Sequence, residues 1–439
     1  MKKFLTCVSC FTLVMAGLFA HGQSESGNVN DKAAEPTVIT ITYAPGNMTS
    51  KMAASDAIKA FNASQDKYEF QQNLSLSSGA YLEILKTLKA SGQMPDVFEC
   101  RNVPTFLRSD MLYPLPQDLQ DLFESNVSVY GKVYTAPLTA QPPHIMLYNK
   151  ALFKKWGLNG KPQNYQEFLD ICEVLKSHGI APMAAGVADI WHIGFLFNYY
   201  FVQYVSHGDP DWFSKVYAGE VKFDNPDMIK AMKLLQDLFV SGDVEKGFMS
   251  TKESQLVSLL VGEKAAMIFT GPWTITQINE ADPDFDLGFF VLPDENGECI
   301  INGGAGAQGW SITKEAAADP AKLAGFVAFV KYFFSHDVYT SYMSKINGFP
   351  TTKEKIEYES SPILTDILKT YNSLEKGESW NIGIGANELP PSFRNWTYKK
   401  VQEMIMNQLT PEQLVKDMDA QWKIDSRDFD PSVLVQMNE

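Results

Sequence analysis

Two spacings of hydrophobic residues alternate along the first part of the chain. The stretch Thr37–Ala44, TVITITYA, is dense in β-branched residues, which predicts a strand. The next stretch, 49–65, repeats apolar residues at helical spacing, and we expect Met52, Ile58 and Phe61 on one face. A strand, an amphipathic helix and a buried strand are predicted at 68–75, 79–92 and 94–100. Because strands and helices alternate, this part is predicted to be an α/β lobe with a largely parallel sheet.

The rest of the chain carries longer helical patterns and a few short strands. Helices are predicted at 165–179, 193–206, 226–241, 252–261, 320–335 and 410–424, and strands at 265–271, 287–293 and within 303–313. Thr410 stands at the start of the last of these helices, and Gln413 stands three residues after Thr410, which is a capping-box pattern. Short strand-like runs flank Pro137 and the pair Pro142-Pro143. Proline is poorly tolerated in a central strand, so a crossover between lobes is the better interpretation of this segment.

The N-terminus has the pattern of an export signal. Two lysines precede the apolar run FLTCVSCFTLVMAGLFA, and small residues follow for cleavage. We expect a signal peptide over 1–22 and a flexible polar tether over 23–36. A retained membrane anchor is the alternative, but a span needs about 18–20 apolar residues, and this run is slightly short. Cys7 and Cys10 lie too early in the run for lipid attachment, so no lipid anchor is expected.

Composition limits the classes of function. A chain of 439 residues suffices for two or three domains, and its net charge of -15 argues against nucleic acid or an anionic membrane surface as partners. Beyond the signal, Cys100, Cys172 and Cys299 are too widely spaced for a disulfide framework or a metal-binding pair. The histidines are scattered, and phosphate-binding loops and nucleophile motifs are missing from the sequence. We therefore expect no metal and no cofactor, whereas the many carboxylates leave a catalytic acid–base pair open.

Several tryptophans lie beside Gly, Pro or polar breaks, namely Trp191, Trp273, Trp310 and Trp396. The clearest case is VGEKAAMIFTGPW, where an apolar run ends at Gly-Pro and Trp273 follows at once. An aromatic face can stack on the C–H face of a sugar ring, while amides and carboxylates bind its hydroxyls. For each tryptophan taken singly, packing in the core is the alternative interpretation.

Longer motifs resemble a known family. The stretches GKVYTAP (131–137) and YNKALFKKWG (148–157) are similar to the signature of the bacterial extracellular solute-binding family 1, the sugar-binding receptors of ABC importers. Further matches are MPDVF, YQEFLDICEVLKSHGIAPMA, GEKAAMIFTGPW and GFPTTKE. The resemblance implies an α/β fold of the periplasmic-binding-protein type, in which two lobes joined by a multi-strand hinge close on a ligand in the cleft between them.

The resemblance also implies how the chain divides. The N-terminal lobe is expected to comprise 37–139 and 305–350, and the C-terminal lobe 140–304 and 351–439. Crossings between the lobes are expected near 137–142, 301–308 and 348–352, where Pro or Gly suits a bend of the backbone.

Candidate site residues are those that match the cleft-facing loops of the family. Three of them, Trp273, Trp396 and Trp191, are implied to stack on the ligand. The polar candidates are Glu99, Asn102, Gln141 and Asn47, and the Gly-rich crossing adds Trp310 and Gln308. The maltose-binding member of the family has a carboxylate at the place of Gln141, so recognition of hydroxyls is expected to differ there. The role of His144, in the unusually Pro-rich QPPH, stays open.

Three functions are compatible with these features. The first is an extracytoplasmic receptor, monomeric and periplasmic or secreted, that hands a sugar or oligosaccharide to the membrane permease of an ABC transporter. The second is a binding protein for another solute, such as a sugar phosphate or a polyamine. The third is an exported carbohydrate-active enzyme, which needs two carboxylates about 5–10 Å apart. A sugar phosphate calls for clustered Arg or Lys, which the candidate residues lack, so a neutral glycan is preferred.

Overall fold

The structure is a computed structural model of the chain. It describes residues 35–44, 48–73, 81–101, 103–107, 109–124, 126–129, 131–140, 143–207, 209, 211–302, 308–358, 360–377, 380, 389–427 and 435–437. The predicted signal peptide and nearly all of the predicted tether lie outside these residues.

The first sheet has five strands in the order β2-β1-β3-β12-β6. These are β1 (Thr37–Thr42), β2 (Tyr68–Gln72), β3 (Val97–Cys100), β6 (Ala136–Pro137) and β12 (Gly309–Ile312). β1 pairs in parallel with β2 and β3, which confirms the parallel arrangement predicted from alternating strands and helices. β12 and β6 are antiparallel additions. Pro137 lies in the edge strand β6, where a missing backbone donor costs least.

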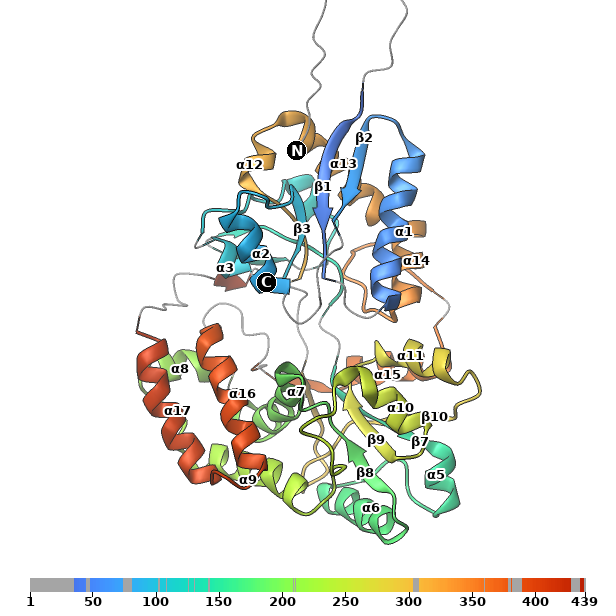
Figure 1. The fold of residues 1–439 in the computed structure, drawn as a ribbon, viewed down its shortest axis with the longest axis vertical. Helices are drawn as coiled ribbons and strands as arrows, with labels where there is room; N and C mark the ends of the chain where they lie inside the picture. The colour runs from blue at the N-terminus through green and yellow to red at the C-terminus, as the bar shows by residue number, and fades with distance from the viewer. Residues whose placement is uncertain are drawn as a thin grey trace, which may run out of the picture. The chain divides into compact units, whose positions relative to one another are not determined.

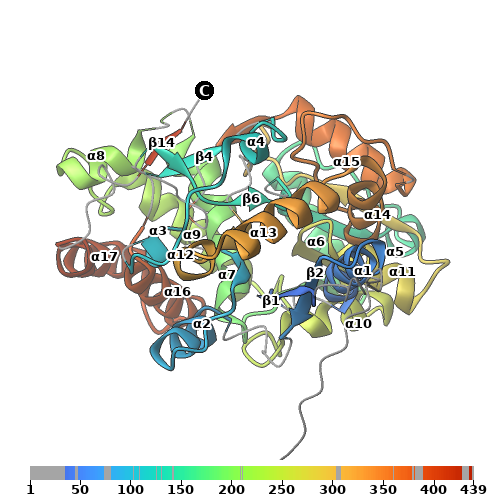
Figure 2. The same ribbon diagram turned by 90° about the horizontal axis from the view of Figure 1, so that it is seen from above.

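Helices α1 (Met48–Ser64), α13 (Pro320–Phe333) and α14 (His336–Ile346) pack together beside this sheet (Figures 1 and 2). On α1, Ile58 and Phe61 are buried as predicted, but Met52 is 56% exposed, so its predicted place on the buried face was wrong. Nine residues of helix turn through about 900°, which puts positions 52 and 61 on opposite sides. The smaller helices of this part are α2 (Tyr81–Ala90), α3 (Val103–Leu107), α4 (Gln117–Gln120) and α12 (Lys314–Ala317).

The second sheet has four strands in the order β10-β7-β9-β8. These are β7 (Ile145–Asn149), β8 (Ala181–Ala184), β9 (Ala265–Thr270) and β10 (Leu287–Phe290). β8 is parallel to β9, whereas β7 is antiparallel to both β9 and β10. The start of β7 therefore lies at the same edge of the sheet as the ends of β8 and β9.

The helices that follow β7 contribute to two further clusters of buried apolar residues. They are α5 (Lys150–Lys155), α6 (Tyr165–Ser177), α7 (Ile190–Phe201) with the π-helix η2 (Val202–Ser206), α8 (Trp212–Ala218), α9 (Pro226–Val240), the 3-10 helix η3 (Glu253–Gln255), α10 (Leu256–Val261), α11 (Thr274–Ala281), α15 (Pro362–Ser373), α16 (Pro391–Ile405) and α17 (Pro411–Asp425). α16 packs against both α7 and α17. The hydroxyl of Thr410 accepts the N–H of Gln413, which confirms the capping role of Thr410, whereas the side chain of Gln413 donates to Asp417 instead of completing a capping box.

Hydrogen bonds join the segments expected to cross between the lobes. The N–H of Leu138 donates to the carbonyl of Gln308 at 3.0 Å, and the N–H of Ala140 donates to the carbonyl of Phe349 at 2.8 Å. The hydroxyl of Tyr339 donates to the carbonyl of Leu138 at 3.0 Å. The division into lobes at these segments stays a prediction.

Two smaller sheets complete the fold. β11 (Ile300–Asn302) pairs with β13 (Glu375–Gly377), and β4 (Val127–Val129) pairs with β5 (Lys132–Val133) and with the C-terminal strand β14 (Val435–Met437). β14 thus adds the end of the chain to a hairpin formed by residues near 130.

Trp310 is a core residue in this structure, and its removal should destabilise the protein. Its side chain is 0% exposed, and its ring makes edge contacts with Tyr43, Phe329 and Phe333. Trp310→Ala should lower the free energy of unfolding by about 3–5 kcal/mol, because it leaves a large cavity. Urea denaturation measures the loss. Trp191→Ala is the control, since that ring is 43% exposed. Equal losses for the two variants would contradict the burial of Trp310.

Candidate functional site

Three loops meet at one edge of the second sheet. Ile145, the first residue of β7, pairs with Thr270, the last residue of β9, and Ala184 at the end of β8 pairs with Ile268. The residues just before β7, just after β8 and just after β9 are therefore neighbours. In open α/β sheets, ligands bind outside the carboxyl ends of the strands, so this edge is the place to look for a site.

An aromatic cluster occupies this edge, and we use the name for Trp273, Phe195, His144, Trp191 and His192. The ring of His144 stacks on Phe195 with centroids 3.8 Å apart. Trp273 meets the edges of His144 and Phe195 at 6.0 and 5.8 Å. Trp191 contacts Phe195 at 5.4 Å and His192 at 5.5 Å. Trp273 is partly buried and Trp191 is exposed, so the cluster presents aromatic surface to solvent.

The sequence around Trp273 fixes the direction of its ring. β9 ends at Thr270, and α11 begins at Thr274, which leaves Gly271, Pro272 and Trp273 as the whole connection. A Cβ atom at Gly271 would overlap the ring of Trp273, so only glycine leaves room for the ring in this place. The tryptophan is thus held against a rigid strand end and a helix start.

Two carboxylates adjoin the aromatic cluster. Glu253, the first residue of η3, accepts the indole N–H of Trp273 on Oε1 at 3.4 Å. The backbone N–H of Glu253 donates to Oδ2 of Asp189, the residue before α7, at 2.8 Å. Burial raises the pKa of Glu253, and Asp189 adds to this, while the hydrogen bond from Trp273 opposes it. In the described part of the chain, no Lys or Arg forms an ion pair with either carboxylate, so the surroundings are acidic.

The two histidines of the cluster are neutral at physiological pH. Burial, together with a smaller effect of the neighbouring His192, lowers the pKa of His144 to about 3. Burial also lowers the pKa of His192 to about 3. The backbone N–H of His144 donates to Oδ1 of Asn302 in β11, which ties the start of β7 to that strand at 3.0 Å. Both imidazoles therefore act as uncharged ring surfaces within the aromatic cluster.

The structure brings two of the predicted tryptophans together, because Trp273 and Trp191 both contact Phe195. Trp396 lies within α16 rather than at a break, with its ring parallel to Phe393 at 6.3 Å. Because α16 packs against α7, Trp396 lies on a helix that is adjacent to the helix carrying Trp191.

The polar candidates lie elsewhere or outside the described residues. Glu99 lies within β3 of the first sheet, where its carboxylate accepts the N–H of Ala44 at 2.9 Å and the Nε–H of Arg101 at 2.7 Å. Gln308 is partly buried, and Trp310 is fully buried in the core, which favours packing over ligand contact. Asn47, Asn102 and Gln141 lie outside the described residues.

Sequence reasoning missed several members of this site. Phe195 follows Trp191 by one helical turn, a spacing that places both on one face of α7 and could have identified it. Asp189 and Glu253 carry no such signal, because the contact between them joins loops that are distant in sequence. His144, whose role the sequence left open, is stacked on Phe195 in the structure.

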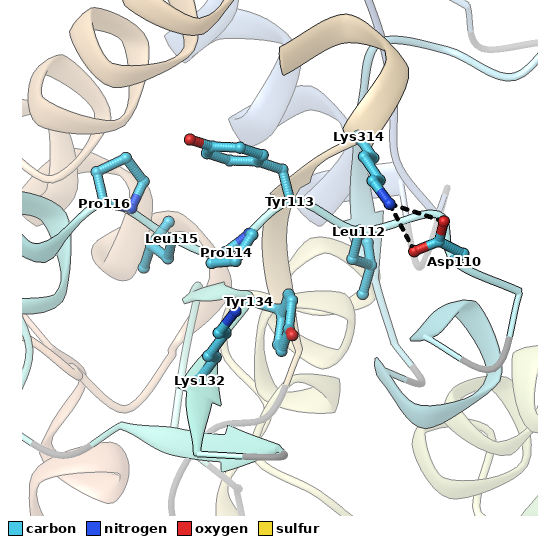
Figure 3. Close-up of a pocket in the computed structure, with 9 residues that line it drawn as sticks. All are labelled: Asp110, Leu112, Tyr113, Pro114, Leu115, Pro116, Lys132, Tyr134 and Lys314. Carbon is cyan, nitrogen blue, oxygen red and sulfur yellow. Dashed lines mark hydrogen bonds and ion pairs between the residues drawn. The ribbon is translucent and has the colours of Figure 1, made fainter. Parts of the chain in front are cut away.

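A separate surface hollow of about 590 Å³ lies in the first part of the chain. Tyr113, Pro114, Lys132 and Tyr134 line it, and a hydrogen-bonded ion pair joins Asp110 and Lys314 at its rim (Figure 3). It contains none of the predicted site residues.

The described residues contain no group of three or more His, Cys, Asp or Glu placed to hold a metal ion. They also contain no helix with the length and apolarity needed to cross a membrane. The side chains of Cys100 and Cys172 are buried, and that of Cys299 is partly buried.

Comparison with known proteins identifies the family. The family model described as bacterial extracellular solute-binding protein matches residues 45–340. The chain belongs to this family. This solute-binding protein is 25% identical over 365 residues to the multiple sugar-binding protein of Streptococcus mutans, covering 78% of this chain and 83% of the relative.

Solved structures share the fold of this solute-binding protein. A chitin oligosaccharide binding protein matches with a TM-score of 0.78 at 23% identity, over 90% of this chain and 100% of the other. RafE in complex with raffinose matches with a TM-score of 0.67 at 20% identity, over 87% and 98%. The fold class expected from the sequence is thereby confirmed.

The buried histidines should make this solute-binding protein sensitive to acid. The pKa of His144 and of His192 falls from 6.5 to about 3 on folding, so each takes up a proton on unfolding between these pH values. The free energy of unfolding should therefore decrease as the pH falls from 6.5 towards 3, by up to about 1.4 kcal/mol per pH unit for each histidine. Urea denaturation at about pH 7 and about pH 5.5 measures this, a range in which few carboxylates titrate.

Substitutions separate the histidines from other titrating groups. His144→Gln and His192→Gln should each reduce the pH dependence, because each removes one of the two buried imidazoles. An identical pH dependence in all variants and the parent protein would show that the histidines are not buried in the neutral form.

Proposed function

We propose that this solute-binding protein captures a sugar or oligosaccharide and delivers it to the membrane permease of an ABC transporter. The observation that carries the proposal is the aromatic cluster, where Trp273 and Trp191 surround Phe195 at the edge of a sheet. Aromatic faces bind the apolar faces of sugar rings, and the adjoining carboxylates of Glu253 and Asp189 are acceptors for hydroxyl groups. A relative that covers most of the chain is a multiple sugar-binding protein, which supports the same ligand class.

The charge of the site favours a neutral ligand over an anionic one. A sugar phosphate or uronate would be repelled by the two carboxylates of Glu253 and Asp189. The nearby histidines are neutral, so they would not offset this repulsion. In the first sheet, the guanidinium of Arg101 is already paired with Glu99. We therefore consider a neutral glycan a better candidate ligand than a sugar phosphate. A cationic polyamine is the alternative ligand class that these carboxylates could also bind.

The remaining parts of the proposal concern the whole protein. The ligand would lie in the cleft between two lobes, 37–139 with 305–350 and 140–304 with 351–439, which close by bending at the hydrogen-bonded crossing segments. Glu99, Asn102, Asn47, Gln141, Gln308 and Trp396 are proposed to complete the site around the aromatic cluster. Residues 1–22 would direct export as a signal peptide, and the protein would act as a monomer without catalysis or cofactor.

The test of this function is a ligand panel read by thermal unfolding. A ligand that binds only the folded protein must raise the melting temperature. The panel should contain neutral mono- and oligosaccharides, a sugar phosphate and a polyamine, and we expect a rise with at least one neutral sugar. A rise only with the sugar phosphate or the polyamine would contradict a sugar receptor, and sugar fragments after incubation would show an enzyme instead.

Trp273 should carry a large share of the ligand affinity. Trp273→Ala removes an aromatic surface that is partly buried and already held in place, so sugar affinity should fall by more than about tenfold while the fold persists. Isothermal titration calorimetry on the sugar identified by the panel measures this.

The control for this variant is Trp156→Ala. Trp156 is also partly buried, but it stacks on His178 at 3.6 Å, outside the aromatic cluster. Its removal should leave affinity unchanged. A Trp273→Ala protein that unfolds, with normal affinity in the fraction that stays folded, would assign Trp273 to the core.

A further inference from the structure

Glu253 occupies the junction of the three elements that build the site. Its side chain receives the indole N–H of Trp273, which follows β9, at 3.4 Å. Its backbone N–H donates to Asp189, which follows β8 and precedes α7, at 2.8 Å. It also begins η3, the turn that leads into α10. One residue thus connects the loops on which the two clustered tryptophans are mounted.

From this junction we propose that Glu253 is a positioning residue for ligand binding, which orients the Trp273 ring and offers a carboxylate oxygen beside it. The inference rests on the proposed function and adds to it a residue that no sequence pattern indicated. It assigns Glu253 two tasks, one for each oxygen of its carboxylate. Oε1 accepts the indole N–H, and Oε2 has no protein partner in the described part of the chain, which leaves it for a ligand hydroxyl.

The backbone around Glu253 is packed closely enough to hold it in place. A Cβ atom at Gly186, in the loop after β8, would lie 2.8 Å from the backbone nitrogen of Glu253. Only glycine at this position allows the two loops to approach so closely. Thr251, two residues before Glu253, is buried and accepts the N–H of Ala188, which fastens the same loops a second time.

The distance to Trp273 limits what the contact can do. At 3.4 Å the hydrogen bond from the indole N–H is at the long end of the range, so it contributes direction more than energy. A tryptophan that is free to turn about its side-chain bonds loses conformational entropy on binding a ligand, and prior orientation removes that cost. The expected consequence of losing Glu253 is therefore a moderate decrease in affinity with an intact fold.

The experiment compares Glu253→Gln and Glu253→Leu in the full protein. Gln keeps an acceptor oxygen for the indole N–H, whereas Leu removes it at nearly the same size. For the neutral sugar found by thermal unfolding, Glu253→Leu should weaken affinity by at least about fivefold, and Glu253→Gln should lose only about twofold. Glu298→Leu is the matched control, since the exposed side chain of Glu298 makes no recorded contact with the described residues.

A second measurement reports on orientation without any ligand. In a ¹⁵N–¹H spectrum, the indole N–H signal of Trp273 is assigned by its loss in Trp273→Phe. Because burial and Asp189 raise the pKa of Glu253, that signal should shift with pH around a midpoint above 4.5. The other titratable groups on the adjoining elements are Asp189 before α7, His192 on α7, His144 before β7 and Lys252 in the chain itself. The shift should vanish in Glu253→Gln, which none of those groups would explain.

These outcomes separate the inference from the proposed function. If the parent protein binds no neutral sugar, the proposed function fails, and the indole titration still decides whether Glu253 orients Trp273. If sugar binds but Glu253→Leu matches Glu298→Leu in affinity, the positioning role is overturned. An indole signal that titrates equally in Glu253→Gln would also overturn it.

Discussion

The antiparallel pairing of β7 with β9 is the constraint on which the site depends. It places His144, at the start of one strand, next to Trp273, just beyond the end of the other. Had the two strands been parallel, these residues would lie at opposite edges of the sheet, some five residues or about 17 Å apart. The parallel pairing of β8 with β9 then brings in the loop that leads to Trp191. The aromatic cluster is thus a product of strand direction, which local sequence does not encode.

The same geometry places two imidazoles where burial keeps them uncharged near neutral pH. His144 is stacked on Phe195, and Nδ1 of His144 and both ring nitrogens of His192 have no hydrogen-bond partner among the described residues. Such burial costs free energy, on the order of 1–3 kcal/mol for each unsatisfied polar group. The cost falls on residues that shape the site and is offset by the apolar packing of the second core. The protein is thereby less stable than it would be without the buried imidazoles, but its aromatic surface is rigid. At low pH its free energy of unfolding decreases further, because unfolding lets the imidazoles take up protons.

Much of the fold could be predicted because its elements are locally consistent. Thr37–Ala44 is dense in β-branched residues, and the alternation of strand and helix through Cys100 indicated a parallel sheet, which the pairing of β1 with β2 and β3 confirms. The start of helix α17 was predictable from Thr410, which is its N-cap residue. The predicted burial of Met52 was wrong because three apolar residues were assigned to one face without allowing for the rotation of about 100° per residue in a helix. The continuation of α7 as the π-helix η2 also escaped prediction, since an extra residue per turn leaves no composition signal.

The candidate site shows the limit of the same reasoning through two tryptophans that gave similar signals. Trp310 and Trp273 both follow a glycine or Gly-Pro break, yet Trp310 lies inside β12 with its side chain fully covered. Trp273 lies beyond the end of β9, where α11 begins immediately, and its side chain is only partly buried. A break that starts a strand leads its aromatic residue into the sheet, whereas a break that ends one leaves it at the edge. The order of break and strand along the chain, rather than the presence of a break, therefore separates a packing tryptophan from one that can meet a ligand.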